Sequence, residues 1–189
     1  MEIGRLSASS ALTRGIPQEV VALDAIRALK TRRSVRKYTD QPVSRELLSE
    51  MVDCARLAAT ARNEQPWEFV VVTDEAERKV IADLTDYGKH IASAGACVAV
   101  FCRDSKYYVE DGSAATQNLL VAAHALALGT CWIAGDKKDY AQPIAEYLKV
   151  PGDYKLVALV SVGFPDETPT RPKRSLEEVL HWGKFGNRE

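Results

Sequence analysis

Three strongly apolar runs constrain the fold of this chain more than any other feature of its sequence. They occupy residues 67–73, 96–102 and 155–163, and each is rich in valine. Runs of this length between turn signals predict β-strands, and the lack of regular alternation with polar residues predicts a sheet covered on both faces. A shorter run at residues 130–134 predicts a further strand or a turn.

The segments between these runs carry apolar residues at helical spacing, so helices alternate with strands. Ser44 suits the N-cap of a helix over residues 45–61, and Asp74 with Glu77 opens a helix that runs through Leu84. Residues 113–129, rich in alanine and leucine, predict the clearest helix, closed by Gly129 beyond its C-cap. Further helices are expected over residues 20–34, 87–94 and 139–148 and from Ser175, with a polar loop at residues 103–112.

This order of elements predicts three layers in an α+β or α/β domain. The chain has 189 residues, which suits one domain with an arm, and we expect residues 1–19 to form an N-terminal arm and residues 20–189 a single domain. The first helix should place Val21, Ala25, Ala28 and Leu29 near one face. The helix over residues 113–129 is apolar enough to pack a subunit interface as well as the sheet, which favours an obligate dimer.

Charge and cysteine usage exclude several classes of protein. The formal net charge is −1, which disfavours a globally basic nucleic-acid binder but is compatible with a local cationic patch for an anionic ligand. The four cysteines (Cys54, Cys97, Cys102 and Cys131) form no C-x-x-C pair, and three lie in apolar runs. This usage predicts reduced thiols and a cytoplasmic location.

Other site classes find no support in the sequence. The three histidines are scattered, so no metal site is expected. No apolar stretch approaches the length of a membrane span and the first twenty residues lack a signal-type apolar core, so neither a membrane anchor nor secretion is expected. Phosphate-binding loops of the G-x-G-x-x-G and P-loop types and the G-x-S-x-G motif are missing from the sequence, which argues against a Rossmann-type nucleotide site and a serine hydrolase.

Residues 32–37, R-R-S-V-R-K, are the first candidate for a binding site. In extended backbone Arg32, Ser34 and Arg36 share a face, and two guanidinium groups with a hydroxyl suit a phosphate monoester. The same cations also suit the C-terminus of the preceding helix, where they favour its dipole. The segment alone leaves both interpretations open.

Three further segments carry polar or flexible groups. Asn63 and Gln65 could bind a heterocycle with alternating donors and acceptors, or they could belong to a simple loop. Residues 171–174, R-P-K-R, matter only if the fold returns them to Arg32. Gly135 could allow backbone to approach a flat ligand, or could simply form a turn in the core. His124 and Cys131 lie among apolar residues and are interpreted as packing residues rather than a base and a nucleophile.

Taken in order, the segments AIRALKTRRSVRKY, AATARNEQPWEFVVVT, QNLLVAAHALALGTCWIAG, SVGFP and RPKRSLEEVL resemble the FMN-dependent nitroreductase family. The similarity runs from about Asp24 to Val179, and R-R-S-x-R with N-x-Q-P-W are its specific elements. It implies an α+β fold, a three-layer α-β-α sandwich with a mostly antiparallel central sheet, in a homodimer with FMN at the interface. It also implies that NADH or NADPH reduces the FMN, which then reduces a nitroaromatic, quinone or related acceptor in a ping-pong cycle.

The resemblance also implies which residues hold the cofactor. Arg32 and Ser34 would bind the phosphate and ribityl chain, with Arg33 contributing mainly backbone, and Arg36 would face the pyrimidine ring and stabilise the reduced flavin electrostatically. Residues Ala59, Thr60, Ala61 and Asn63 would reach the cofactor from the other subunit, with Gln65 nearby. The backbone of Ile133, Ala134 and Gly135 would pass along the ring near N5, and Arg171 and Lys173 would close on the phosphate.

The chain departs from the family pattern at several positions. Ala59-Thr60 replaces a pair that often carries more hydroxyls, and Ala134 stands where many members have an acidic residue. Lys89 is a candidate for a second cation near the pyrimidine ring. The segment Arg103 to Gly112 is short, which predicts a small, open acceptor pocket.

Two other functions remain as alternatives at this stage. One is a flavin-binding protein for storage or sensing without efficient turnover. The other is a binding module for a phosphate-bearing ligand without a redox role.

Overall fold

The computed structural model describes residues 23–188, and its centre is one antiparallel sheet of four strands in the order β1-β2-β4-β3. The strands are β1 (Trp67–Val72), β2 (Ala96–Arg103), β3 (Gly129–Ala134) and β4 (Tyr154–Gly163). The three predicted apolar strands are therefore confirmed, and the shorter run forms the fourth. The predicted arm over residues 1–19 lies outside the described residues.

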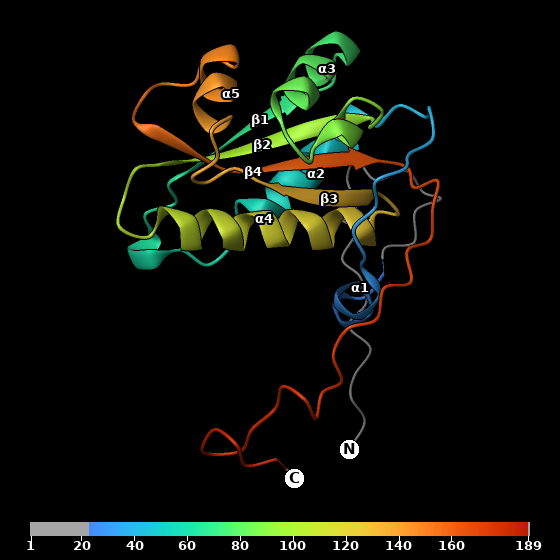
Figure 1. Cartoon of the computed structure of the whole chain (residues 1–189), viewed down its shortest axis with the longest axis vertical. Helices are drawn as coiled ribbons and strands as arrows, with labels where there is room; N and C mark the ends of the chain where they lie inside the picture. Colours follow the sequence, from blue (N-terminus) through green and yellow to red (C-terminus); the bar gives the residue numbers. More distant parts are fainter. Residues whose placement is uncertain (1–22, 189) are drawn as a thin grey trace, which may run out of the picture.

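Helices cover both faces of this sheet, which gives the expected α-β-α sandwich (Figure 1). Helices α2 (Arg45–Ala55) and α4 (Tyr108–Ala125) lie on one face, and α3 (Glu75–Leu84) and α5 (Ala141–Tyr147) lie on the other. Alternate residues of β2 enter the two cores: Val98 packs with α2 and α4, whereas Phe101 packs with α3 and α5. Both faces need apolar side chains, which explains why the strands lack polar alternation.

The longest helix begins and ends elsewhere than the sequence predicted. Helix α4 begins at Tyr108, so the prediction of a polar loop over residues 103–112 was wrong. Glu110 and Asp111 lie in the first helical turn, where carboxylates interact favourably with the helix dipole. Gly129 does not close the helix. Ala127 takes the left-handed conformation (φ 62°), and the N–H of Leu128 donates to the carbonyl of Ala123 at 2.8 Å, which forms a Schellman end.

Gly129 instead begins β3, where it lies against the segment that follows the first helix. A Cβ at Gly129 would lie 2.9 Å from the side chain of Val35. The glycine is therefore needed for close approach and not for an unusual dihedral angle. This contact holds residues 34–38 against the end of the sheet.

Other predicted helices also differ from their expected extents. Helix α2 ends at Ala55, because the carbonyl of Cys54 binds the N–H of Leu57 and the side chain of Asn118. Helix α1 (Ala25–Thr31) buries Ala28 but leaves Leu29 exposed, and Val21 of the predicted apolar face lies outside the described residues.

The predicted helix from Ser175 is a turn in which Ser175 N–H donates to Glu178, because exposed neighbours give a short helix no packing support. The segment predicted at residues 87–94 contains a 3₁₀ turn, Lys89–Ile91.

Two coil segments distant in sequence run together beside α1. Ser34 pairs with Thr130 at the start of β3, and Tyr38 pairs with Pro165 beyond the end of β4. The N–H of Thr39 donates to the carbonyl of Phe164 at 2.9 Å. The chain after β4 is thus brought back to the R-R-S-V-R-K segment. No helix within residues 23–188 is long and apolar enough to cross a membrane.

Candidate functional site

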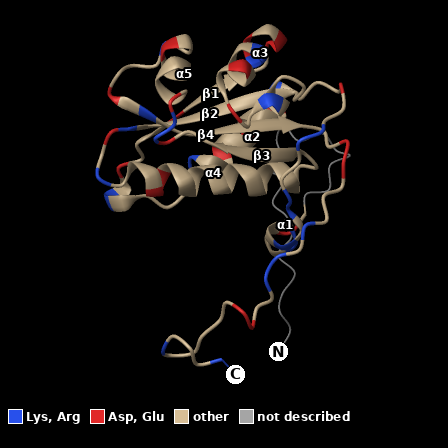
Figure 2. Ribbon diagram, viewed as in Figure 1, with Lys and Arg blue, Asp and Glu red and all other residues tan. Residues whose placement is uncertain are grey.

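A hollow of about 810 Å³, here named the basic hollow, lies between the two coil segments. It joins the R-R-S-V-R-K segment to the chain beyond residue 166, so Arg171 and Lys173 do return to Arg32. Figure 2 shows Lys and Arg recurring along α1 and the coil beside it. The residues that line the basic hollow are Arg32, Arg33, Ser34, Arg36, Lys37, Glu167, Pro169, Thr170, Arg171, Pro172 and Lys173.

The backbone after α1 is extended, and this places alternate side chains on opposite sides. Arg32 has a ψ of 132°, and the N–H of Val35 donates to the carbonyl of Thr130 at 2.9 Å. Val35 and Tyr38 face the core and are buried. Arg32, Ser34 and Arg36 consequently share the side that faces the basic hollow.

Arg33 is an exception within this segment. Its guanidinium donates to the carbonyls of Lys30 at 3.0 Å and Arg32 at 2.9 Å, at the end of α1. The interpretation as a cation at a helix C-terminus thus fits Arg33, which also lines the basic hollow.

The electrostatics of the basic hollow favour an anionic ligand. Six cationic side chains line it beside one carboxylate, that of Glu167. Burial and the nearby charge of Arg33 lower the pKa of Arg32, which reports a partly desolvated cation among like charges. An anion placed there would relieve this repulsion.

Glu167 is a site residue that sequence reasoning missed. Its Oε1 accepts the backbone N–H of Arg36 at 2.6 Å and that of Lys37 at 3.2 Å, and these bonds lower the pKa of the carboxyl. The contact spans 131 residues of sequence, so no local pattern could have indicated it.

A second hollow of about 320 Å³, here named the strand-end hollow, adjoins the basic hollow through Arg36. It lies at the end of β3, and its lining residues are Arg36, Tyr87, His90, Cys131, Trp132, Ile133, Ala134, Lys138 and Tyr140. Ile133 and Ala134 were expected at the site, whereas Tyr87, His90, Lys138 and Tyr140 were not. These four lie in loops or turns whose return to β3 has no sequence signature.

Two titratable side chains of the strand-end hollow, His90 and Cys131, favour their neutral forms. Burial, followed by the charge of Arg36, lowers the pKa of His90. Burial raises the pKa of the Cys131 thiol despite the nearby arginines. The hollow therefore presents an imidazole and a thiol in uncharged form, and Cys131 is not poised as a thiolate nucleophile.

Gly135 lies just beyond this hollow and is closely packed against β4. A Cβ there would lie 2.6 Å from Cγ of Leu156, and the glycine N–H donates to the carbonyl of Val157 at 3.0 Å. Lys89 is placed differently: its ammonium donates to the carbonyls of Ala82 and Asp83 at the end of α3. The lysine that lines the strand-end hollow is therefore Lys138 and not Lys89.

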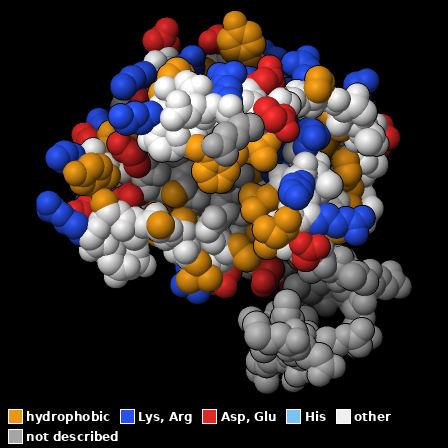
Figure 3. Space-filling view, turned by 90° about the horizontal axis from the view of Figure 1, so that it is seen from below, with side chains coloured by type: hydrophobic (Ala, Val, Ile, Leu, Met, Phe, Trp, Pro, Cys, Tyr) orange, Lys and Arg blue, Asp and Glu red, His pale blue; other side chains and the backbone are white. Residues whose placement is uncertain are grey.

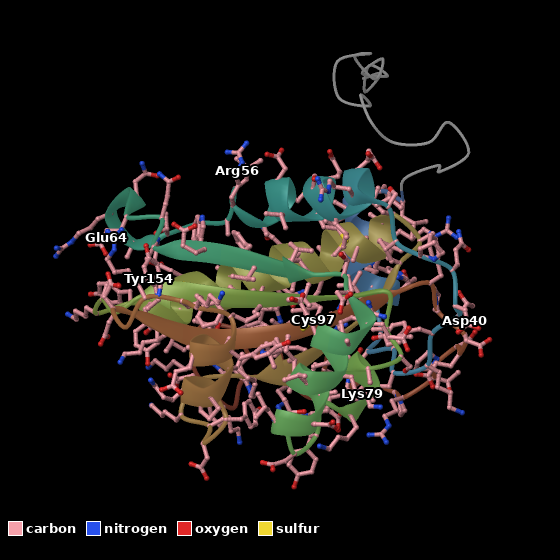
Figure 4. All side chains as sticks on the ribbon, turned by 90° about the horizontal axis from the view of Figure 1, so that it is seen from above. Asp40, Arg56, Glu64, Lys79, Cys97 and Tyr154 are labelled. Carbon is pink, nitrogen blue, oxygen red and sulfur yellow. The ribbon has the colours of Figure 1, made fainter. Side chains whose placement is uncertain are left out.

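The loop over residues 59–65 lies apart from both hollows. None of Ala59, Thr60, Ala61, Asn63 and Gln65 lines either hollow. The loop lies beside the N-terminal end of α4, whereas the segment 32–37 lies near the C-terminal end (Figure 1). Figure 4 likewise shows Glu64 and Asp40 at opposite sides of the molecule. Within one chain the structure does not bring the two groups of expected site residues together.

This loop has an unusual backbone conformation. Arg62, Asn63 and Gln65 have φ values of 55°, 60° and 47°. Non-glycine residues rarely adopt this left-handed region, and strained residues cluster at functional sites. The side chains of Asn63 and Gln65 are exposed, so both amides are available to a ligand outside their own chain.

Asp111 is a second residue that sequence reasoning missed. Its buried carboxylate accepts the Thr60 hydroxyl and the Ala61 N–H, each at 3.0 Å. Because the segment around Asp111 looked like a polar loop, nothing indicated a buried carboxylate. His124, in contrast, has the satisfied environment expected for it, with its Nε2 lying 2.8 Å from the Thr31 hydroxyl.

Apolar side chains are exposed on α1 and on the chain after β4. They are Ile26, Leu29, Leu176, Val179, Trp182 and Phe185. Figure 3, which views the molecule from below, shows hydrophobic side chains grouped on this face. Within residues 23–188, no three His, Cys, Asp or Glu side chains form a group suited to a metal ion.

Comparisons with known proteins identify relatives along most of the chain. The model of the nitroreductase family matches residues 29–96 and 103–164. A protein of Methanothermobacter thermautotrophicus, named provisionally as an NADH dehydrogenase/NAD(P)H nitroreductase, is 33% identical over 164 residues, which cover 84% of this chain and 86% of that protein.

Solved structures agree with this match. The FMN-dependent nitroreductase of Clostridium difficile superposes with a TM-score of 0.80 at 29% identity, over 85% of this chain and 99% of that one. A protein of Desulfovibrio desulfuricans, described provisionally as a nitroreductase and solved in complex with FMN, superposes with a TM-score of 0.74 at 28% identity, over 86% of this chain and 98% of the other.

Proposed function

The chain belongs to the nitroreductase family, and from this premise we propose that it is an oxidoreductase that binds FMN, takes electrons from NADH or NADPH and reduces nitroaromatic, quinone or related acceptors. The observation that carries the proposal is the basic hollow, which gathers six cationic side chains from two distant segments of a chain with almost no net charge.

The residues of the basic hollow fit the phosphate end of FMN. A phosphate monoester carries nearly two negative charges at neutral pH and accepts several hydrogen bonds. Arg32 and Ser34 offer a guanidinium fork and a hydroxyl on one side, and Arg171 and Lys173 offer cations on the other. We assign the phosphate and ribityl chain to these four residues, with Arg33 contributing through its backbone.

The strand-end hollow fits the ring end of the same cofactor, because Arg36 lines both hollows. When bound, FMN supplies the redox chemistry by accepting hydride from a nicotinamide and returning electrons to an acceptor. Arg36 would place a fixed positive charge beside the pyrimidine ring and so stabilise the negative charge of the reduced state. The backbone of residues 133–135 would line the ring.

The electron donor and the acceptor would both have to reach the flavin at the strand-end hollow. The strand-end hollow is small, about 320 Å³, and its His90 and Cys131 side chains are uncharged. Once the flavin ring occupies a hollow of this size, only one further flat ring at a time would have room against it. We therefore propose that the nicotinamide and the acceptor use the same place in turn, which is a ping-pong cycle.

We further propose that the site is shared between two chains. The exposed amides of Asn63 and Gln65 lie far from the basic hollow of their own chain, and the apolar side chains on α1 and the chain after β4 require a cover. A homodimer that brings residues 59–65 of one protomer to the hollows of its partner would meet both requirements.

Flavin content and reduction test this function. Purified protein should carry about one FMN per chain, its flavin absorbance should bleach with NADH or NADPH under anaerobic conditions, and a quinone should restore it. Flavin that binds but does not bleach would support the storage or sensing alternative. A colourless protein that FMN cannot reconstitute would contradict both.

A further inference from the structure

Asp111 is a buried carboxylate in the first turn of α4. The residue is 4% exposed. None of the ion pairs among residues 23–188 includes it. A carboxylate removed from water without a cation must be stabilised by hydrogen bonds, here with help from the helix N-terminus. The identity of its hydrogen-bond donors therefore indicates what the residue is for.

Both donors come from the loop over residues 59–65. The Thr60 hydroxyl donates to Oδ2 and the Ala61 N–H donates to Oδ1, each at 3.0 Å. The Thr60 Oγ1 in turn accepts the N–H of Gln65 at 3.1 Å. Asp111 and Thr60 thus connect helix α4 to both ends of the loop.

The conformation of the loop explains why such a connection is needed. Arg62, Asn63 and Gln65 are left-handed, which disfavours this backbone in the absence of restraints. Within the loop, the Asn63 N–H donates to the carbonyl of Thr60 at 3.4 Å and the Glu64 N–H donates to that of Ala61 at 3.0 Å. The charge-assisted bonds to Asp111 are the restraints from the body of the protein.

We propose that Asp111 is a positioning residue for the cofactor site of the other protomer: its carboxylate fixes the loop so that Asn63 and Gln65 are presented to the flavin held by the partner chain. The inference rests on the proposed shared FMN site and adds a residue that touches neither cofactor nor substrate. The buried carboxylate at the start of α4 would then serve the cofactor site of the partner chain and not the site of its own chain.

Two substitutions at Asp111 test the role within one chain. Asp111→Ala removes both acceptors, and Asp111→Asn keeps the shape and one acceptor. We expect Asp111→Ala to raise the Kd for FMN roughly ten-fold or more, as the loss of a charge-assisted hydrogen bond implies, and Asp111→Asn to have a smaller effect. Glu110→Gln, a change at the adjacent exposed carboxylate, is the matched control and should leave the Kd unchanged.

Amide hydrogen exchange supplies a readout independent of FMN. In both Asp111 variants the Ala61 and Gln65 amides should exchange faster, while the amides of β2 and β4 keep their protection. This measurement on Asp111→Asn remains informative even if Asp111→Ala fails to fold. Unchanged exchange of the loop amides and an unchanged Kd in Asp111→Asn and Asp111→Ala would overturn the proposal.

A heterodimer separates action on the partner from action on the same chain. The Asp111→Ala chain, carrying one affinity tag, is co-expressed with a chain that combines Arg32→Ala and Ser34→Ala and carries another tag. In the heterodimer one site unites intact Arg32 and Ser34 with an intact loop, and the other site has both parts damaged. We expect one FMN per heterodimer, bound with the wild-type Kd.

The outcomes distinguish this inference from the proposed function. A heterodimer without any wild-type-affinity site would show that Asp111 serves its own chain, and would overturn the inference. If the homodimer of the Arg32→Ala, Ser34→Ala chain retains FMN with wild-type Kd, the assignment of the phosphate site fails instead, and the loop-exchange measurement alone then decides the role of Asp111.

Discussion

The carboxylate of Glu167 lies 2.6 Å from the backbone nitrogen of Arg36, within a hollow lined by six cationic side chains. An anion at this place would repel a bound phosphate if it acted through its charge alone. Its hydrogen bonds to the N–H groups of Arg36 and Lys37 indicate another role, which is to hold the chain after β4 against the R-R-S-V-R-K segment.

We therefore predict that Glu167→Ala weakens FMN binding by about ten-fold, in line with the loss of hydrogen bonds to a charged group, because Arg171 and Lys173 would no longer be held at the hollow. Fluorescence titration with FMN measures the effect. In a chain that already carries Arg171→Ala and Lys173→Ala, the same change should cost nothing further. Tighter binding of FMN by Glu167→Gln would show instead that repulsion dominates.

Arg32 and Ser34 should recognise the phosphate rather than the ring. We predict that Arg32→Ala raises the Kd for FMN by roughly one hundred-fold and Ser34→Ala by roughly ten-fold, the ranges for hydrogen bonds to charged and neutral partners. The Kd for riboflavin, which lacks the phosphate, should change little in either variant. Lys30→Ala, at an exposed cation of α1 that does not line the hollow, is the control. Equal losses for FMN and riboflavin would contradict the assignment.

The sequence predicted the framework of the fold because the strands and most helices are encoded locally. The run that became β2 is apolar throughout and the run that became β4 is mostly so. Ser44 and Asp74 cap their helices as expected, with side chains that accept the N–H groups of Leu47 and Glu77. Errors arose at helix ends. Ala127 provides the left-handed residue that the sequence suggested for Gly129, and no local rule favours alanine there.

The candidate site was predictable only in the parts that carry unusual local composition. Two basic clusters stand out in the sequence, R-R-S-V-R-K with Arg32 and Ser34, and R-P-K-R with Arg171. Glu167 and Asp111 act through contacts with residues that are distant in sequence, and an isolated carboxylate has no local signature. The amides of Asn63 and Gln65 were candidates from their chemistry, and the family resemblance added Ala59, Thr60 and Ala61. The left-handed dihedral angles in this loop come from the structure alone.

The close approach of Gly129 to Val35 predicts a steric effect that reaches the basic hollow. A Cβ at residue 129 would lie 2.9 Å from the Val35 side chain, so Gly129→Ala should destabilise the fold by about 1–3 kcal/mol, the usual cost of overpacking. Urea unfolding measures this change. Val35→Ala keeps Cβ but removes Cγ1 and Cγ2, two of the three nearest atoms at this contact, so in that background Gly129→Ala should cost less. Additive losses in the double variant would show that the two residues do not compete for the same space.

Two partly buried histidines predict how the stability of the protein depends on pH. Burial and neighbouring arginines lower the pKa of both His90 and His124 in the folded state. The unfolded chain therefore binds protons more readily near pH 6.5, and the contribution of these groups to stability is complete above that pH and declines as the pH falls toward their folded pKa values. We predict that the free energy of unfolding falls between pH 7 and pH 5, and that His124→Asn, at the histidine outside both hollows, makes the slope shallower. Urea denaturation across this range measures the slope in both proteins, and an equal slope in the variant would mean that His124 titrates normally when folded.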